Sequence, residues 1–246
     1  AVELLQPFLK GVEPEVTLPP RTPRHDRTSI LYPVQPGTGG PELGIYRPGT
    51  HEIEPITDCR IQHKALTELG VRTGSVLRRL RLRAYDEKAH QGLVRAFRAR
   101  IMPGTNELLF GIVATTRRFD ERERLVELLW SAAQGLRDDQ GRPIKPVGVI
   151  LNENTARGNA LLGPTNVVQH GRGWQTDAVA GLHLRVSFAS FYQQNRHAEA
   201  ILFRPALAML GDVSGAVMSS LAERISITAG SDVRLREIAE IVEAGE

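Results

Sequence analysis

The chain has 246 residues, enough for one large domain or two smaller ones, and its 41% hydrophobic and 24% charged residues are ordinary for a soluble globular protein. No apolar run approaches the ~20 residues that span a bilayer, so no membrane partner is expected and a cytoplasmic protein is the prediction. The single cysteine, Cys59, excludes an internal disulfide framework and any all-cysteine metal or iron–sulfur site built from this chain alone. The net charge of +3 and the clustered arginines favour a polyanion such as nucleic acid as the binding partner.

The first part of the chain predicts a connector, two strands and a helix. Residues 1–27 combine a short apolar run with a proline-rich stretch that could not form its own core. "TSILYPVQ" then predicts a strand, "PGTGGPE" a turn, and "LGIYRPGTHEIEPI" a second strand that is interrupted near Pro48 and Gly49. A helix is predicted near 60–70 from the spacing of four apolar residues, Ile61, Ala65, Leu66 and Leu69.

The period changes at "LRRLRLRAYD", which predicts a strand with one basic face. Leu80, Leu82 and Ala84 alternate there with Arg79, Arg81 and Arg83. "LVRAFRARI" and "NELLFGIVATTR" predict two more strands of an antiparallel meander, and further arginines could join the same positive face: Arg78, Arg95, Arg98 and Arg100. Such a face would bind RNA phosphates, although the solvated outer face of a half-exposed sheet explains the local pattern equally well.

The second half predicts another helix and several strands. "DERERLVELLWSAAQGLRD" is the clearest helix, with Asp120 as a candidate N-cap and one apolar face formed by Leu125, Leu128, Leu129 and Ala132. "PVGVILNEN" predicts a strand, and "GPTNVVQHGRGWQTDAVAGLHLRVSFASF" predicts two or three. "NRHAEAILFRPALAML" predicts a helix with Pro205 as a kink or boundary, followed by a short strand and a final helix from about Val233. The fold class is therefore α+β, with a mostly antiparallel sheet and one long packed helix.

The stretch "SFYQQN", Ser190 to Asn195, places two aromatic rings and two glutamines at the exit of a strand. One interpretation is structural, with the amides capping the next helix and Asn195 as its N-cap. The other is a binding shelf, because aromatic rings stack on flat heterocycles and amides bind their edges. The local pattern alone favours the cap. Cys59 with His63 four residues later is a weak nucleophile candidate, since sequence neighbours rarely form a dyad.

Three segments occur in a characteristic order: "IYRPGTHEIEPITDCRIQH", "VGVILNENTARGNALLGPTNVV" and "GLHLRVSFASFYQQNRHAEAIL". In this order they resemble the RNA uracil-5-methyltransferase family, S-adenosylmethionine-dependent enzymes that make 5-methyluridine in ribosomal and transfer RNA. The resemblance covers about residues 25–211. It implies an N-terminal connector (1–27), a central α+β domain (28–189), and the divergent start of a methyltransferase domain (190–246) in place of a complete Rossmann-like domain.

The resemblance also implies roles for single residues. Phe191 matches the family's base-stacking aromatic residue, and Gln193 matches its cofactor-contacting glutamine. Cys59 matches the fourth ligand of the [4Fe–4S] cluster that many members hold. The other three ligands have no counterpart in the sequence, and a single thiolate cannot hold that cluster.

The family's cofactor loop and its nucleophilic cysteine have no counterpart either, because no cysteine follows Cys59. We therefore expect that the chain alone neither binds S-adenosylmethionine nor methylates RNA. Two alternatives stay open: a non-catalytic RNA-binding module that uses the Arg78–Arg83 face, or one part of a split enzyme whose methyltransferase domain lies on a separate chain.

Overall fold

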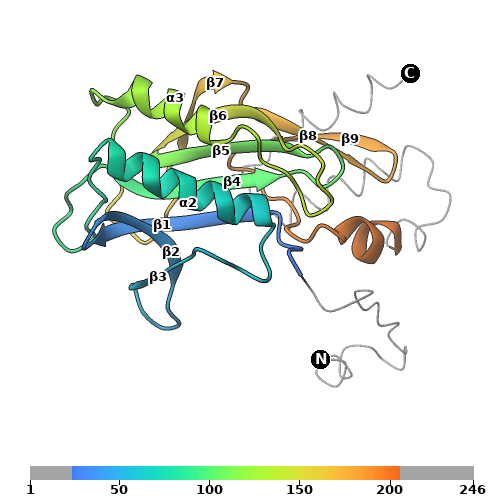
Figure 1. The fold of residues 1–246 in the computed structure, drawn as a ribbon, viewed down its shortest axis with the longest axis horizontal. Coiled ribbons are helices and arrows are strands. Elements are labelled where there is room, and N and C mark those ends of the chain that lie inside the picture. Colours follow the sequence, from blue (N-terminus) through green and yellow to red (C-terminus); the bar gives the residue numbers. More distant parts are fainter. Residues whose placement is uncertain (1–23, 206–246) are drawn as a thin grey trace. The chain divides into compact units, whose positions relative to one another are not determined.

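The computed structural model describes residues 24–205, and these form a seven-stranded sheet, a separate two-stranded hairpin and two α-helices (Figure 1). The sheet order is β3-β2-β1-β4-β5-β6-β7, and every neighbouring pair is antiparallel except β5 with β6. That parallel pair is joined through α3, the crossover that parallel strands require. The predicted α+β class with a mostly antiparallel sheet is confirmed. The bounds are β1 (Ser29–Gly37), β2 (Gly40–Tyr46), β3 (Ile53–Pro55), α2 (Lys64–Arg79), β4 (Val94–Ile101), β5 (Glu107–Ala114), α3 (Arg122–Ala132), β6 (Lys145–Glu153), β7 (Thr165–Gly171), β8 (Trp174–Val179), β9 (Leu182–Ser187) and the π-helical turn η1 (Glu199–Phe203).

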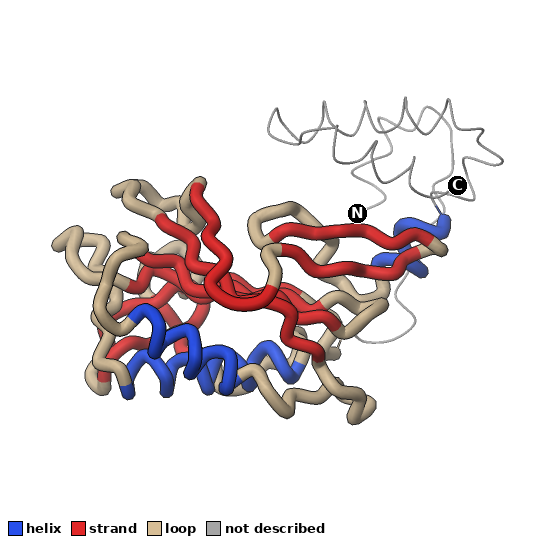
Figure 2. The backbone as a smooth tube through the Cα atoms, turned by 90° about the horizontal axis from the view of Figure 1, so that it is seen from above, coloured by secondary structure: helices blue, strands red, loops and turns tan. Residues whose placement is uncertain are grey.

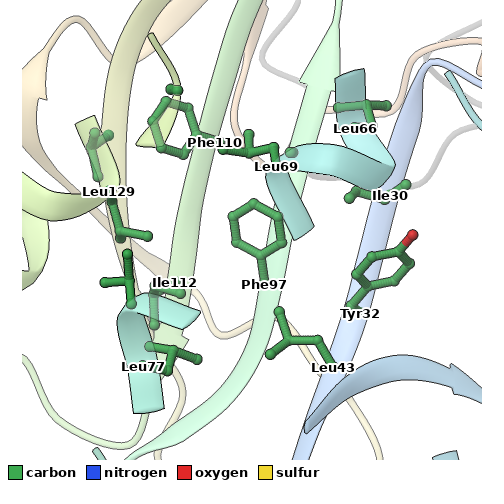
Figure 3. Packing of buried hydrophobic residues seen from close by; sticks show 14 of the residues in the cluster. Ile30, Tyr32, Leu43, Leu66, Leu69, Leu77, Phe97, Phe110, Ile112 and Leu129 are labelled. Atoms are coloured by element: carbon green, nitrogen blue, oxygen red, sulfur yellow. The ribbon is translucent and has the colours of Figure 1, made fainter. Parts of the chain in front are cut away.

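The core lies between one face of the sheet and the two helices, which cover the same face (Figure 2). In the β1–β4 register, Tyr32 lies opposite Phe97, and both side chains point towards the helices. Leu69 of α2 packs against this layer (Figure 3), and its side chain is fully buried. Burying side chains of this size is worth ~1.5–3 kcal/mol each, which makes this layer the main source of stability.

The opposite sheet face is covered in part by the loop between β6 and β7. Asn152, which is fully buried, donates from Nδ2 to the Gly163 carbonyl at 2.8 Å and accepts at Oδ1 from the Gly163 amide at 2.7 Å. Phe188, just after β9, packs on this face against Leu109 and Ile150. The second face thus provides a rigid base for the segment that follows β9.

The helix predicted near 60–70 begins at Lys64 and runs to Arg79, so the strand predicted from "LRRLRLRAYD" is wrong. The side chain of His63 caps the helix, with its Nδ1 accepting from the Ala65 amide at 3.3 Å. The buried face continues at helical spacing through Leu77, and this longer 3–4 period overrides the short Leu–Arg alternation.

Most other expectations are confirmed, but the helix predicted from "NRHAEAILFRPALAML" is, in its described part, mainly the π-helical turn η1, and two expectations for α3 are not met. The broken second strand is β2 and β3, which pair as a hairpin, and the three late strands are β7, β8 and β9. The helix α3 begins after Glu121, whose side chain makes no capping bond, so the predicted cap at Asp120 is wrong. α3 is also shorter than α2, at 11 residues against 16. The predictions for 1–23 and for the tail from 206 onward lie outside the described residues.

Candidate functional site

The segment Ser190–Asn195 lies where β1 begins, because three hydrogen bonds tie Gln194 to the residues before that strand. The Thr28 amide donates to the Gln194 carbonyl at 2.7 Å, and the Thr28 hydroxyl donates to the same oxygen at 3.1 Å. Arg27 Nε donates to Gln194 Oε1 at 2.7 Å. These contacts join residues more than 160 positions apart in the sequence, so the placement of the segment depends on the complete sheet.

The entrance to the segment is held by a buried arginine. Arg100 Nη2 donates to the Ser190 carbonyl at 2.6 Å, and the Ser187 and Ser190 hydroxyls lie 2.6 Å apart. Arg100 is 5% exposed; burial, with added repulsion from Arg98, lowers the pKa of its guanidinium to about 9. No carboxylate pairs with this cation among the hydrogen bonds and ion pairs of residues 24–205, and its backbone acceptors offset its desolvation only in part, because its Nε is buried without a partner.

Tyr192 is held by a carboxylate of the β8–β9 hairpin. Its hydroxyl donates to Asp177 Oδ2 at 2.6 Å, while Asp177 Oδ1 accepts from the Gly104 amide at 2.7 Å. Burial raises the pKa of Tyr192, and the bond to Asp177 raises it further, because a phenolate could not donate. Tyr192 therefore stays neutral and keeps the segment pinned to the hairpin.

The exit of the segment confirms the capping interpretation for Asn195. Its Oδ1 accepts from the His197 amide at 2.9 Å, and its carbonyl accepts from the Ala198 amide at 3.0 Å. Beside it, Arg196 makes a double contact to Asp139, at 2.8 and 3.2 Å. The two interpretations of the motif thus apply to different residues within it.

Phe191 and Gln193 are the two residues of the segment whose side chains have no assigned partner in the described part of the chain. Phe191 is 83% exposed, which is unusual for a large aromatic ring. Gln193 is half-buried, and its amide makes no hydrogen bond among residues 24–205. Phe191 lies between the fixed residues Ser190 and Tyr192, and Gln193 lies between Tyr192 and Gln194. Both side chains are therefore presented at defined positions for a ligand.

The predicted basic face does not form, because its arginines lie on three different parts of the fold. Arg79 ends α2, and Arg81 and Arg83 lie on the exposed loop that follows it. That loop is near the β1–β2 turn, at the end of β1 opposite Thr28 and the segment Ser190–Asn195 (Figure 1).

The β4 arginines belong to the sheet face away from the helices. Arg95 donates to the carbonyls of Asn154 and Gly158, each at 3.2 Å, and Arg98 lies over the Phe188 ring with its guanidinium carbon 5.6 Å from the centroid. β4 pairs along its length with β1 and β5, and the loop after α2 meets only the start of β4, where the Arg83 carbonyl accepts from the Leu93 and Val94 amides at 2.9 and 3.0 Å.

Cys59 lies half-buried on the loop between β3 and α2 and forms no disulfide. His63 is 2% exposed, and burial lowers its pKa to about 4, so it is neutral and serves as the cap of α2. No group of three or more His, Cys, Asp or Glu in the described ranges could hold a metal ion. One thiol is therefore all that this chain offers to an iron–sulfur cluster, which does not fit a four-ligand site.

Sequence reasoning missed that Arg27, Arg100 and Asp177 position the segment; it had placed Arg100 on an RNA-binding face instead. None has a local signal, since each acts over a long sequence separation. Within residues 24–205, none of the helices has the length and hydropathy to cross a membrane.

Comparison with known proteins gives matches over most of this chain. It is 28% identical over 186 residues to an uncharacterized RNA methyltransferase of Oceanobacillus iheyensis, covering 75% of this chain and 38% of the relative. A relative from Lactiplantibacillus plantarum is 28% identical over 203 residues (82% and 42%), and one from Caldanaerobacter subterraneus is 30% identical over 168 residues (68% and 35%). The chain belongs to the RNA methyltransferase family.

The sequence prediction of an RNA methyltransferase is thus confirmed, and uracil C5 as the target atom stays a prediction. The chain spans about two fifths of the length of these curated relatives. No family model matches it. Its fold is similar to that of a Pyrococcus abyssi tRNA (uracil-54, C5)-methyltransferase solved with S-adenosyl-L-homocysteine, with a TM-score of 0.61 at 17% identity, covering 83% of this chain and 45% of that one.

Proposed function

We propose that this RNA methyltransferase homologue acts in the S-adenosylmethionine-dependent methylation of uridine C5 in ribosomal or transfer RNA. In this proposal the described part of the chain binds RNA and supplies one wall of the site. The observation that carries it is the division within Ser190–Asn195: Tyr192, Gln194 and Asn195 are held by the fold, while the side chains of Phe191 and Gln193 are left for a ligand.

Phe191 is proposed to stack on a base of the RNA. An exposed ring gains little from its present surroundings, whereas stacking on a base is worth ~1–3 kcal/mol and tolerates any base. Arg100 holds the Ser190 carbonyl before Phe191, and Asp177 holds the Tyr192 hydroxyl after it. Little conformational entropy is therefore lost when the base binds.

Gln193 is proposed to contact the cofactor. Its free amide offers both a donor and an acceptor, which fits the polar groups of S-adenosylmethionine, and when bound that cofactor supplies the methyl group. A bound polar ligand would give this amide the hydrogen-bond partners that residues 24–205 do not supply.

We propose further that the 246-residue chain alone binds RNA without completing methyl transfer. Its one thiol is Cys59, on the loop between β3 and α2, and no second thiol is available to attack uracil C6. Under this proposal the part of the active site that holds the nucleophilic thiol comes from a separate chain. The exposed side chains of Arg79, Arg81 and Arg83 favour the alternative of an RNA-binding module without catalysis. A cytoplasmic location is part of the same proposal.

The test combines binding and chemistry on the 246-residue chain. RNA affinity is measured by fluorescence anisotropy, and labelled 5-methyluridine is measured by mass spectrometry after incubation with unmodified RNA and methyl-labelled S-adenosylmethionine. We expect RNA binding that weakens roughly fivefold or more in Phe191→Leu, in line with a stacking loss of ~1–3 kcal/mol, and persists in Phe191→Trp. Val71→Ala, at an exposed position on α2, is the control that should change nothing.

Three results would contradict the proposal. Labelled 5-methyluridine made by the chain alone would refute its inactivity. Absence of RNA binding by the wild-type chain, or equal affinity of wild type and Phe191→Leu, would refute the role of the segment.

A further inference from the structure

A cavity of about 490 Å³ opens at the other end of the sheet from Ser190–Asn195. Its walls are the β1–β2 turn, residues 36–41, and the loop that links α2 to β4. Three arginines are among its lining residues: Arg78, Arg81 and Arg83. It is thus a second concave surface, separated from the candidate site by the length of β1. The nine residues of that strand span roughly 26 Å.

The cations of the cavity are not neutralised by the fold. The side chains of Arg81 and Arg83 are exposed and make no hydrogen bond or ion pair with residues 24–205. Arg78 makes only long contacts, at 3.4 Å to the Pro41 carbonyl and 3.3 Å to the Ser75 hydroxyl. The one carboxylate in the lining, Asp86, already accepts from the Lys88 and Ala89 amides, at 2.8 and 3.1 Å. Three arginines against one carboxylate leave a net positive charge around the space, which favours an anion within it.

The backbone of Arg81 supports a role outside folding. Arg81 has φ of 53°, in the left-handed region, and lies at the position after the α2 C-cap that glycine normally occupies. The Arg81 amide donates to the Arg78 carbonyl at 3.0 Å, and the Leu82 amide donates to the Leu77 carbonyl at 3.1 Å, which completes a Schellman motif. Glycine would make this turn with less strain, and the arginine side chain adds no hydrogen bond or ion pair within residues 24–205.

The chemistry of the lining indicates a phosphate rather than a base. Guanidinium groups match the geometry of phosphate oxygens, and the cavity has no aromatic ring on which a base could stack. Gln91 is the one amide side chain in the lining, so there is little capacity to distinguish one base from another.

We propose that this cavity binds a backbone phosphate of the RNA, at a distance from the nucleotide held at Phe191. The proposal rests on the RNA substrate of the proposed function. A phosphate contact of this kind fixes the position of the RNA on the sheet and is independent of base sequence. It therefore acts as an anchor, while the segment Ser190–Asn195 holds one nucleotide by stacking on Phe191.

The test uses Arg81→Gly and Arg83→Gln in the 246-residue chain, with RNA affinity measured by fluorescence anisotropy across a series of salt concentrations. Each variant should weaken RNA binding roughly threefold or more and reduce the slope of log affinity against log salt by about 0.7, the value for one lost single-strand contact. Arg81→Gly should leave the melting temperature unchanged or raise it, because it relieves the left-handed backbone. Loss of binding with a retained or raised melting temperature separates a binding role from a structural one.

Arg124→Gln is the matched control. It also removes one exposed arginine, but Arg124 pairs with Glu127 at 2.7 Å and should leave the affinity and the salt slope unchanged. Wild-type affinity and slope in both cavity variants, with binding still weakened by Phe191→Leu, would overturn the cavity proposal and leave the proposed function standing. No RNA binding by the wild type would overturn both.

Titration with inorganic phosphate at constant ionic strength distinguishes the source of the anion. If calorimetry shows phosphate binding that Arg81→Gly abolishes while RNA affinity is unchanged, the cavity takes a small free anion and the RNA assignment is wrong. RNA affinity that falls in both cavity variants supports the RNA phosphate.

Discussion

The hydrogen bond between Tyr192 and Asp177 should be a main contact that holds the segment Ser190–Asn195 in place. Tyr192→Phe tests this, because it removes only the hydroxyl oxygen. The Asp177 carboxylate is 3% exposed, and its Oδ2 accepts from the Tyr192 hydroxyl at 2.6 Å. In the variant Oδ1 keeps the Gly104 amide, but Oδ2 loses this donor. A buried hydrogen bond to a charged group is worth about 1.5–3 kcal/mol, so we expect a loss of about 2 kcal/mol in the free energy of unfolding.

This loss is measurable by urea and thermal unfolding. The urea midpoint should fall by roughly 1 M for a slope near 2 kcal/mol/M, and the melting temperature by roughly 4–8 °C for a chain of this size. RNA affinity should also fall, because Phe191 would no longer be fixed on one side. The matched control is Tyr46→Phe, whose hydroxyl lies 3.3 Å from Glu87 Oε1 on a more exposed carboxylate and should cost less than about 1 kcal/mol. Equal unfolding curves for the two variants would refute the reasoning.

Two further predictions concern the fold that supports the site. Asn152→Ala removes the buried amide that bonds to Gly163 and Asn166. In urea titrations it should lower the free energy of unfolding by about 2–3 kcal/mol. A loss below about 0.5 kcal/mol would contradict the role of Asn152 in holding the β6–β7 loop. The folded-state pKa of His63 is lowered from 6.5 to about 4 by burial, so between these values the unfolded chain binds more protons than the folded one. The contribution of His63 to the free energy of unfolding is therefore fully present above pH 6.5. It is lost as the pH falls towards 4, by an amount on the order of 3 kcal/mol. His63→Asn keeps a capping side chain without a titrating group, and its unfolding free energy should vary less across this window than that of wild type; identical pH profiles would contradict the assignment.

The fold was predictable where one hydrophobic period dominated a long segment. α3 and the strands β1, β4, β5 and β6 follow such patterns, and the structure confirms them. The short Leu–Arg alternation at 79–84 predicted a strand, but α2 continues to Arg79, with Leu77 packed in the core, and the residues after Leu80 form a loop. A six-residue window does not reveal this, because the deciding contacts come from distant strands.

The candidate site also depends on contacts from distant parts of the sequence, which a short window does not show. The sequence singled out Ser190–Asn195 but could not separate its fixed residues from its free ones. The separation depends on Arg27, Arg100 and Asp177, which reach the segment only in the folded sheet. The roles of Phe191, Gln193 and Arg81 remain predictions for the experiments above.

Photocrosslinking tests the central claim most directly. RNA carrying 4-thiouridine is irradiated with the 246-residue chain, and the crosslinked peptide is mapped by mass spectrometry. The account predicts a crosslink at Phe191 that Tyr192→Phe weakens. Crosslinks that map only to other parts of the chain, with none in Ser190–Asn195, would contradict it.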